Sequence, residues 1–241
     1  MPKKIPLLFF PGLLCDEALW RHQIKSLETM AECRVADLTG HDRIDALARA
    51  TLATAPQQFA LVGLSMGGYV AFEIMRQAPE RVLKLCLLDT SARTDTPEQS
   101  ERRRLLMDMS RAGQFQEVTP RLLPLLIHAD RLHDTELATT VMAMAERVGA
   151  EAFYRQQTAI IHRIDSRPYL KNIRCPTQAI VGRQDALTPL EIMREIADGI
   201  GGARFDIIEN CGHLSPLERP EAVTALMKQW LEGSQEKEIS R

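Results

Sequence analysis

Three residues far apart in the sequence have the side chains needed for acyl transfer. Ser65 lies in the stretch VGLSMGGYV, Asp185 in VGRQDALTP and His213 in NCGHLSPLE. A serine hydroxyl is a weak nucleophile until a base removes its proton, and an imidazole base needs a third group to hold its tautomer and stabilise its positive charge. The order Ser, Asp, His is the one expected for such a triad on an α/β fold. We therefore predict a catalytic triad of Ser65, His213 and Asp185.

The residues around Ser65 match the pattern of a nucleophile elbow. Gly63-Leu64-Ser65-Met66-Gly67 has the form G-x-S-x-G, and it lies between a buried apolar run and a stretch with helical spacing. A turn of this kind lifts the side chain at its apex above the carboxyl edge of the sheet, where α/β folds bind ligands. The glycines let the strand and the helix approach each other closely.

Each member of the predicted triad also has a plainer interpretation. Ser65 could be a helix N-cap, Asp185 a turn former, and His213 a loop histidine that caps its neighbours. Asp89 also follows a strand, so it is the alternative acid of the triad. The three residues together, each next to the carboxyl end of a predicted strand, favour the catalytic interpretation.

Acyl transfer also needs donors for the negative oxygen of the tetrahedral intermediate. One donor is the backbone N–H of Met66, at the start of the helix that follows the elbow. We expect the other in the loop FPGLLCDEALW after the first strand, where Leu13 is the candidate and Leu14 its neighbour. The nearby Cys15 is read as a small buried thiol rather than a nucleophile.

The apolar period alternates between strand and helix along most of the chain, which predicts a doubly wound α/β fold. The sheet is expected to be mostly parallel, with about six strands and helices on both faces. The hydroxyl of Thr188 and the carboxylate of Asp16 are predicted N-caps of the helices that follow them. The predicted strands are 5–10, 33–38, 59–64, 82–88, 177–181 and 203–208, and the predicted helices begin near 17 and cover 44–55, 68–77, 189–198 and 221–231.

Between residues 91 and 167 the alternation stops, and the apolar residues keep helical spacing. About seventy residues are too many for one structureless loop, so we predict an all-helical insertion. The chain then divides into a core formed by 1–90 and 168–241 and an inserted domain formed by 91–167. The apolar residues of the insertion either pack its helices together or line an apolar pocket.

The net charge of −2 gives no general field that would hold nucleic acid or an anionic membrane, so neither is an expected partner. The densest basic run, Arg102 to Arg104, is interpreted as a solvated helix face. No apolar run approaches the length that crosses a membrane. The opening MPKKIPLLFFPGLL is interrupted by prolines and lacks a small-residue cleavage site, which disfavours a signal peptide.

Five cysteines in the chain are widely spread and contain no C-x-x-C pair. This usage favours a reducing compartment and a cytoplasmic protein, with neither disulfides nor a zinc site. His128 and His133 are five residues apart and do not share one helical face, so we predict no metal site. No cofactor is expected.

Four segments, VGLSMGG, VGRQDALTP, CGHLSPLERPEAV and DLTGHD, resemble those of the α/β-hydrolase superfamily. The acid and histidine loops look most like those of the branch with esterases, lactonases and C–C hydrolases that includes 3-oxoadipate enol-lactonases. The chain departs from the family pattern in three ways. Pro11-Gly12 replaces the usual His-Gly, and the two amino-terminal strands of larger members are absent. DLTGHD matches the family's D-x-P-G-H-G segment only in part and has no assigned role.

The resemblance implies a helical cap, formed by 91–167, over the active site. It implies a cofactor-free serine hydrolase that cleaves a small ester, thioester or lactone through an acyl-enzyme, with a small-molecule acyl substrate as its partner. Two alternatives stay open. The same triad serves C–C hydrolases, lyases and perhydrolases, and the same fold serves non-catalytic binding modules.

Overall fold

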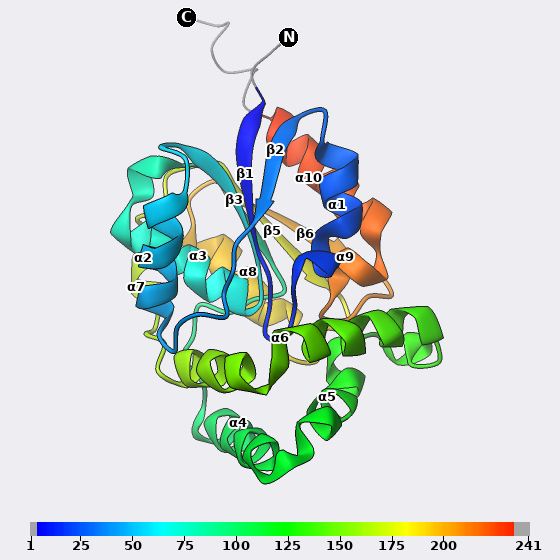
Figure 1. Cartoon of the computed structure of the whole chain (residues 1–241). Helices are drawn as coiled ribbons and strands as arrows, with labels where there is room; N and C mark the ends of the chain where they lie inside the picture. Colours follow the sequence, from blue (N-terminus) through cyan, green and yellow to red (C-terminus); the bar gives the residue numbers. More distant parts are fainter. Residues whose placement is uncertain (1–3, 234–241) are drawn as a thin grey trace, which may run out of the picture.

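Six parallel strands form the centre of the fold, in the order β2-β1-β3-β4-β5-β6 (Figure 1). The computed structural model describes residues 4–233. This arrangement confirms the predicted α/β fold and the number of its strands. The strands are β1 Ile5–Phe10, β2 Ala31–Val35, β3 Phe59–Leu64, β4 Val82–Leu88, β5 Thr177–Gly182 and β6 Arg204–Ile208.

Helices cover both faces of the sheet (Figure 1). One face carries α2 Ile44–Thr54, α3 Met66–Gln77, α7 Arg167–Leu170 and α8 Leu190–Gly199. The other carries α1 Arg21–Leu27, α9 Ser215–Glu218 and α10 Pro220–Glu232. The 3₁₀ turns η1 Glu17–Trp20 and η2 Pro79–Arg81 precede α1 and β4. Asp16 caps η1 as predicted, because its carboxylate accepts the N–H of Ala18.

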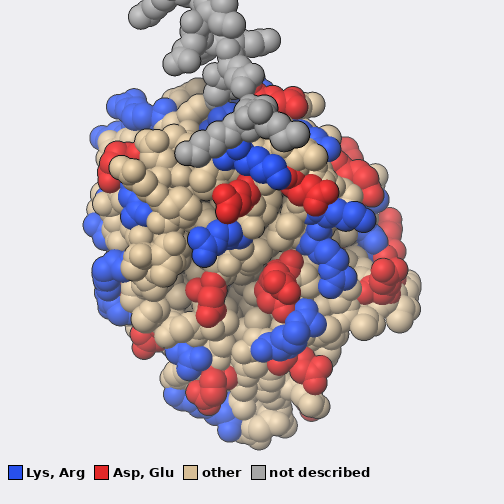
Figure 2. Space-filling view, turned by 45° about the horizontal axis from the view of Figure 1, so that its top comes forward, with Lys and Arg blue, Asp and Glu red and all other residues tan. Residues whose placement is uncertain are grey.

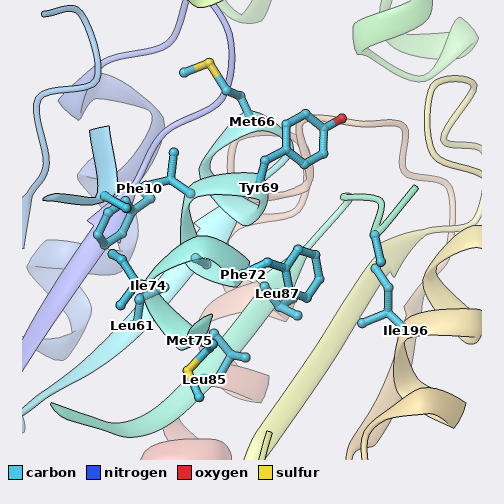
Figure 3. Close-up of a cluster of buried hydrophobic side chains, with 14 of the residues drawn as sticks. Phe10, Leu61, Met66, Tyr69, Phe72, Ile74, Met75, Leu85, Leu87 and Ile196 are labelled. Carbon is cyan, nitrogen blue, oxygen red and sulfur yellow. The ribbon is translucent and has the colours of Figure 1, made fainter. Parts of the chain in front are cut away.

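The central strands are buried on both faces, which explains why their sequences are continuous apolar runs rather than alternating ones. Every residue of β3 and β5 is buried. Figure 3 shows Leu61 and Leu87, from β3 and β4, in one cluster with Phe72 and Ile74 of α3. This packing fixes α3, and with it the turn that leads into the helix, against the sheet.

The strand predicted at 33–38 corresponds to β2, which begins two residues and ends three residues earlier than expected. Its residues Ala31 to Val35 pair with β1, and the N–H of Ala36 makes a last bond to the carbonyl of Phe9. Asp37 then ends the strand, because its carboxylate accepts the N–H of Thr39 in a tight turn.

Between β4 and β5 the described chain is helical, as predicted. Its long helices are α4 Pro97–Met109, α5 Val118–Leu126 and α6 Thr135–Ile161, joined by the short turns η3 Ser110–Gln114, η4 Phe115–Glu117 and η5 Ala129–Arg131. Gly149, with φ of 79°, divides α6 at a kink. The helices lie across the carboxyl ends of the strands (Figure 1). We call residues 91–167 the helical insertion.

Within the described residues, no helix has the length and apolar character required to cross a bilayer. On the face shown in Figure 2, lysines and arginines are interspersed with aspartates and glutamates. A surface of this kind has no concentrated field of one sign on that face.

Substitution of Gly67 tests the close approach of α3 to β1. A Cβ atom at Gly67 would lie 2.0 Å from the backbone oxygen of Phe10, so the helix would have to move away from the strand. We expect Gly67→Ala to lower the free energy of unfolding by about 3 kcal/mol, the upper end of the usual cost of overpacking. Chemical denaturation measures this change.

Gly40→Ala is the matched control, because a Cβ at the exposed Gly40 would meet nothing within 4 Å. Its effect should stay within about 0.5 kcal/mol. Equal stability of the two variants would show that α3 does not approach β1 as closely as described.

Candidate active site

Ser65 lies at the turn between β3 and α3 in a conformation that non-glycine residues rarely adopt, with φ of 53° and ψ of −115°. Neighbouring groups hold this backbone in place. The N–H of Ser65 donates to the carbonyl of Leu88 at 3.1 Å, and its carbonyl accepts the N–H of Gly68 at 2.9 Å and the Thr90 hydroxyl at 2.7 Å. Strain of this kind persists only where the surroundings over-determine it, and it is common at active sites.

The glycines of the elbow are required by close contact rather than by positive φ. A Cβ at Gly63 would lie 2.7 Å from the carbonyl oxygen of Gly67, and one at Gly68 would lie 2.3 Å from the hydroxyl oxygen of Thr90. The sequence pattern G-x-S-x-G-G is therefore the condition for bringing Ser65 to the edge of the sheet.

Asp185 and His213 are buried side by side beyond β5 and β6. The imidazole Nδ1 of His213 lies 2.8 Å from Oδ2 of Asp185. The other carboxylate oxygen accepts the N–H groups of Leu187 and Thr188, at 2.8 and 2.9 Å. These bonds fix the carboxylate, and the carboxylate in turn orients the imidazole.

The prediction that Thr188 caps the following helix is wrong. The hydroxyl of Thr188 donates instead to Oδ2 of Asp185 at 2.5 Å and lies 3.4 Å from Nδ1 of His213. α8 begins at Leu190, and its N-cap Pro189 makes no side-chain capping bond. The buried carboxylate takes the hydroxyl because an ionised oxygen is the stronger acceptor.

Burial and mutual charge set the pKa values of this pair in opposite directions. Burial disfavours the charged imidazolium, but the Asp185 carboxylate outweighs it and raises the pKa of His213 above its ordinary 6.5. Burial likewise disfavours the Asp185 carboxylate, but the charge and hydrogen bond of His213 lower the pKa of Asp185 below 3.8. An Asp carboxylate that stabilises an imidazolium is the arrangement that general base catalysis requires.

Ser65 and His213 line one cavity of about 230 Å³ between the sheet and the helical insertion. The structure thus joins His213 directly to Asp185, and Ser65 lines the same cavity as the imidazole. Within residues 4–233 the Ser65 hydroxyl makes no hydrogen bond. Catalytic hydrogen bonds of ligand-free enzymes are often long, so an unbonded hydroxyl is compatible with a nucleophilic role for Ser65.

Asp89, the alternative acid, occupies a different position. Its carboxylate accepts the N–H of Gly182 at 2.8 Å and the hydroxyl of Ser215. Burial and the nearby charge of Asp185 raise the pKa of Asp89 well above its usual value. Asp89 therefore connects β4, β5 and the histidine loop, whereas Asp185 contacts the imidazole.

The loop after β1, where the second oxyanion donor is predicted, is held by the helical insertion. Leu14 has φ of 58°, and its N–H donates to Oε1 of the buried Gln156 at 3.1 Å. The Gln156 amide nitrogen donates to the carbonyl of Leu38 at 3.3 Å. Because the N–H of Leu14 is occupied, Leu13 and Met66 stay the predicted oxyanion donors.

The segment DLTGHD, which had no assigned role, anchors α6. The carbonyl of Leu38 accepts from Gln156, and that of Thr39 accepts Nε of Arg155 at 2.7 Å. No local pattern marks either glutamine or arginine as a partner of this loop.

Glu218 ties the histidine loop to the same insertion. Its carboxylate accepts the N–H of Gly212 at 2.9 Å and that of His128 at 2.7 Å. The N–H of His213 donates to the carbonyl of Leu126, at the end of α5. The insertion is thus attached to the loops that flank the cavity.

The walls of the cavity differ in chemistry. Five apolar side chains line it from the insertion, Leu106, Leu122, Leu126, Val141 and Ile160. Phe153 instead packs among the helices. Cys15 also lines the cavity, but burial raises the pKa of its thiol to about 12, so it stays protonated.

The basic run of α4 is solvated, as predicted, at the exposed Arg102 and Arg104, but not at the half-buried Arg103. Arg102 and Arg103 both line the cavity, and Nε of Arg103 pairs with Asp95 at 2.6 Å. Arg104 is exposed and pairs with Glu101, as a solvated residue would. Within residues 4–233, no three metal-ligating side chains gather at one place.

The Alpha/beta hydrolase family profile matches residues 7–226 of this chain. The chain belongs to the alpha/beta hydrolase family. This family match and the elbow, acid loop and histidine loop described above agree with the resemblance drawn from the sequence.

The pimeloyl-[acyl-carrier protein] methyl ester esterase of Nitrosomonas europaea is 25% identical to this chain over 229 residues, which cover 89% of this chain and 91% of that protein. The malate-bound structure of a thermophilic esterase from Thermogutta terrifontis is 29% identical with a TM-score of 0.87, covering 96% and 90% of the two chains. The enol-lactonase of Burkholderia xenovorans shares the fold, with 23% identity, a TM-score of 0.85 and coverage of 95% and 92%.

The titration of His213 tests the pairing with Asp185. We expect the imidazole to titrate above 6.5, and Asp185→Asn to lower its pKa, because burial then acts without the compensating carboxylate. NMR of the imidazole ring protons across a pH series measures both values.

Asp198→Asn, which neutralises an exposed carboxylate of α8, is the control and should leave the titration of His213 unchanged. A wild-type pKa below 6.5, or equal pKa values in wild type and Asp185→Asn, would contradict the described pair.

Proposed function

We propose that this protein is a serine hydrolase that cleaves a small carboxylic ester, thioester or lactone through an acyl-enzyme intermediate. One observation carries the proposal: His213 is bound to Asp185 through Nδ1, and a strained serine lines the same cavity as this histidine. With Nδ1–H donating to the carboxylate, the Nε2 lone pair is free to accept a proton from the serine.

The proposed reaction assigns a role to each residue. The Ser65 oxygen attacks the substrate carbonyl while its proton passes to His213, and Asp185 stabilises the imidazolium. The N–H groups of Leu13 and Met66 donate to the oxyanion of the tetrahedral intermediate. The intermediate collapses as His213 returns the proton to the leaving group, and water, activated by the same imidazole, then hydrolyses the acyl-enzyme.

Esters are favoured over the other bonds that this triad can cleave because two of the similar proteins named above are esterases. A substrate panel distinguishes ester hydrolysis from C–C hydrolysis, lyase chemistry and perhydrolysis. A fluorophosphonate probe distinguishes an enzyme from a non-catalytic binding module. The partner is a small-molecule acyl substrate. Five unpaired cysteines fit a reducing compartment, so we place the protein in the cytoplasm.

Replacement of Ser65 tests this function. Ser65→Ala should lower kcat on p-nitrophenyl esters by at least about a thousandfold, because removal of a triad serine can cost roughly a millionfold in kcat. A panel of acyl esters, thioesters, enol-lactones and dienoates then identifies the bond cleaved. Full esterase activity of Ser65→Ala would refute the proposal.

A fluorophosphonate probe provides the control for a rival nucleophile. It should label the wild type and Cys15→Ala equally, because the thiol of Cys15 stays protonated, and should not label Ser65→Ala. Loss of labelling in Cys15→Ala but not in Ser65→Ala would identify Cys15 as the nucleophile.

A further inference from the structure

A cluster of charged side chains forms part of the cavity wall on the side of the helical insertion. The Asp95 carboxylate lies between two guanidinium groups, 2.6 Å from Nε of Arg103 and 2.7 Å from Nη1 of Arg163. Arg102, one residue before Arg103 on α4, lines the same cavity. We call Asp95, Arg102, Arg103 and Arg163 the arginine cluster.

Within the arginine cluster, Arg103 and Arg163 hold two positive charges against one carboxylate in a poorly solvated place, whereas Arg102 is exposed. The side chains of Asp95, Arg163 and Arg103 are 1%, 6% and 20% exposed. One carboxylate thus serves two guanidinium groups, and Arg102 makes no ion pair within residues 4–233. Charges with little access to water are normally balanced by partners. The ring of Tyr69, 4.3 Å from the Arg163 guanidinium, offsets part of the excess.

The other charged groups around the cavity do not supply the missing negative charge. Arg93 lines the cavity and is paired with Glu195 at 2.8 Å. Glu191, in the first turn of α8, also lines the cavity but forms no ion pair with the arginine cluster in the described chain.

Hydrogen-bond donors of the cluster are also unused. Arg103 donates through Nε and Nη1, and Arg163 bonds through Nε and Nη1, which leaves Nη2 of both without a partner in the described chain. The fully buried Gln157 accepts from Arg103 at 2.9 Å, but its own amide nitrogen has no hydrogen-bond partner there. Gln157 lines the same cavity. Of these donors, the Gln157 amide nitrogen is buried, and a buried donor without an acceptor is costly, which indicates a ligand with acceptor oxygens.

We propose that the arginine cluster and Gln157 bind a carboxylate at the end of the substrate remote from the bond that is cleaved. This inference rests on the proposed function and specifies its substrate class: esters of acids that carry a second, free carboxylate. Two carboxylate oxygens match the forked edge of a guanidinium. The apolar side chains of the insertion, among them Leu106 and Ile160, would contact the hydrocarbon part between the two ends.

Matched substrates test the charge preference directly. A series of straight-chain dicarboxylic acid monomethyl esters is compared with the same esters whose free carboxylate is replaced by a carboxamide. We expect kcat/KM to be higher for the acid than for the isosteric amide at the best chain length by roughly ten- to hundredfold, the range for a hydrogen bond to a charged group.

Arg103→Gln and Arg102→Gln should each reduce this acid-to-amide ratio, and the larger reduction is expected for the more buried Arg103. The ratio compares two substrates of one variant, so a general loss of activity cancels. Arg104→Gln, on the exposed side of the same helix, is the control and should keep the wild-type ratio. Equal kcat/KM for acid and amide in the wild type would overturn the proposed carboxylate site and leave the hydrolase function standing.

A binding measurement separates this inference from catalysis. Calorimetry with free dicarboxylates should detect binding to Ser65→Ala, and Arg102→Gln, combined with Ser65→Ala, should weaken it even if Arg103→Gln fails to fold. Dicarboxylate binding by a wild-type protein that cleaves no ester would support the carboxylate site and refute the proposed reaction. Hydrolysis of neutral esters without any dicarboxylate binding would do the reverse.

Discussion

The close packing of α3 against β1 and β3 is the constraint on which the site depends. It admits no side chain at Gly63 or Gly67, while Thr90 after β4 admits none at Gly68, and Ser65 between them is held at positive φ. The helix can approach so closely because its inner face and the central strands form one apolar core. Packing of the core thus supports the strained turn, and the turn places the hydroxyl at the cavity.

The helical insertion is connected to this site through polar contacts as well as through the cavity wall. Gln156 holds the loop that contains Leu13, and Glu218 joins the histidine loop to the insertion. Movement of the insertion would therefore disturb both the predicted oxyanion donors and the position of His213. In the proposed reaction, the element that selects the substrate also positions the groups that act on it.

The fold and the predicted triad residues could be read from the sequence because their signals are local. Continuous apolar runs mark the buried strands, and the glycines around Ser65 mark the elbow. The loops of Asp185 and His213 follow strands whose carboxyl ends share one edge. The end of β2 was misplaced, since a turn at Asp37 and pairing with β1 decide it.

The remaining features depend on contacts between distant segments. Thr188 has the pattern of an N-cap, but the buried carboxylate of Asp185 outcompetes the helix end for its hydroxyl. Arg103 belongs to a polar run typical of a solvated helix, yet it faces Asp95, Gln157 and Arg163 from other parts of the insertion. No spacing within α4 distinguishes Arg103 from the exposed Arg104.

A crystal structure of the protein inactivated by a methyl phosphonate ester would identify the nucleophile and the oxyanion donors together. We expect a covalent bond between phosphorus and the Ser65 oxygen, with His213 Nε2 beside the adduct. The phosphonyl oxygen should accept the N–H groups of Leu13 and Met66. An adduct on any other residue, or a phosphonyl oxygen turned away from both N–H groups, would contradict the proposed reaction.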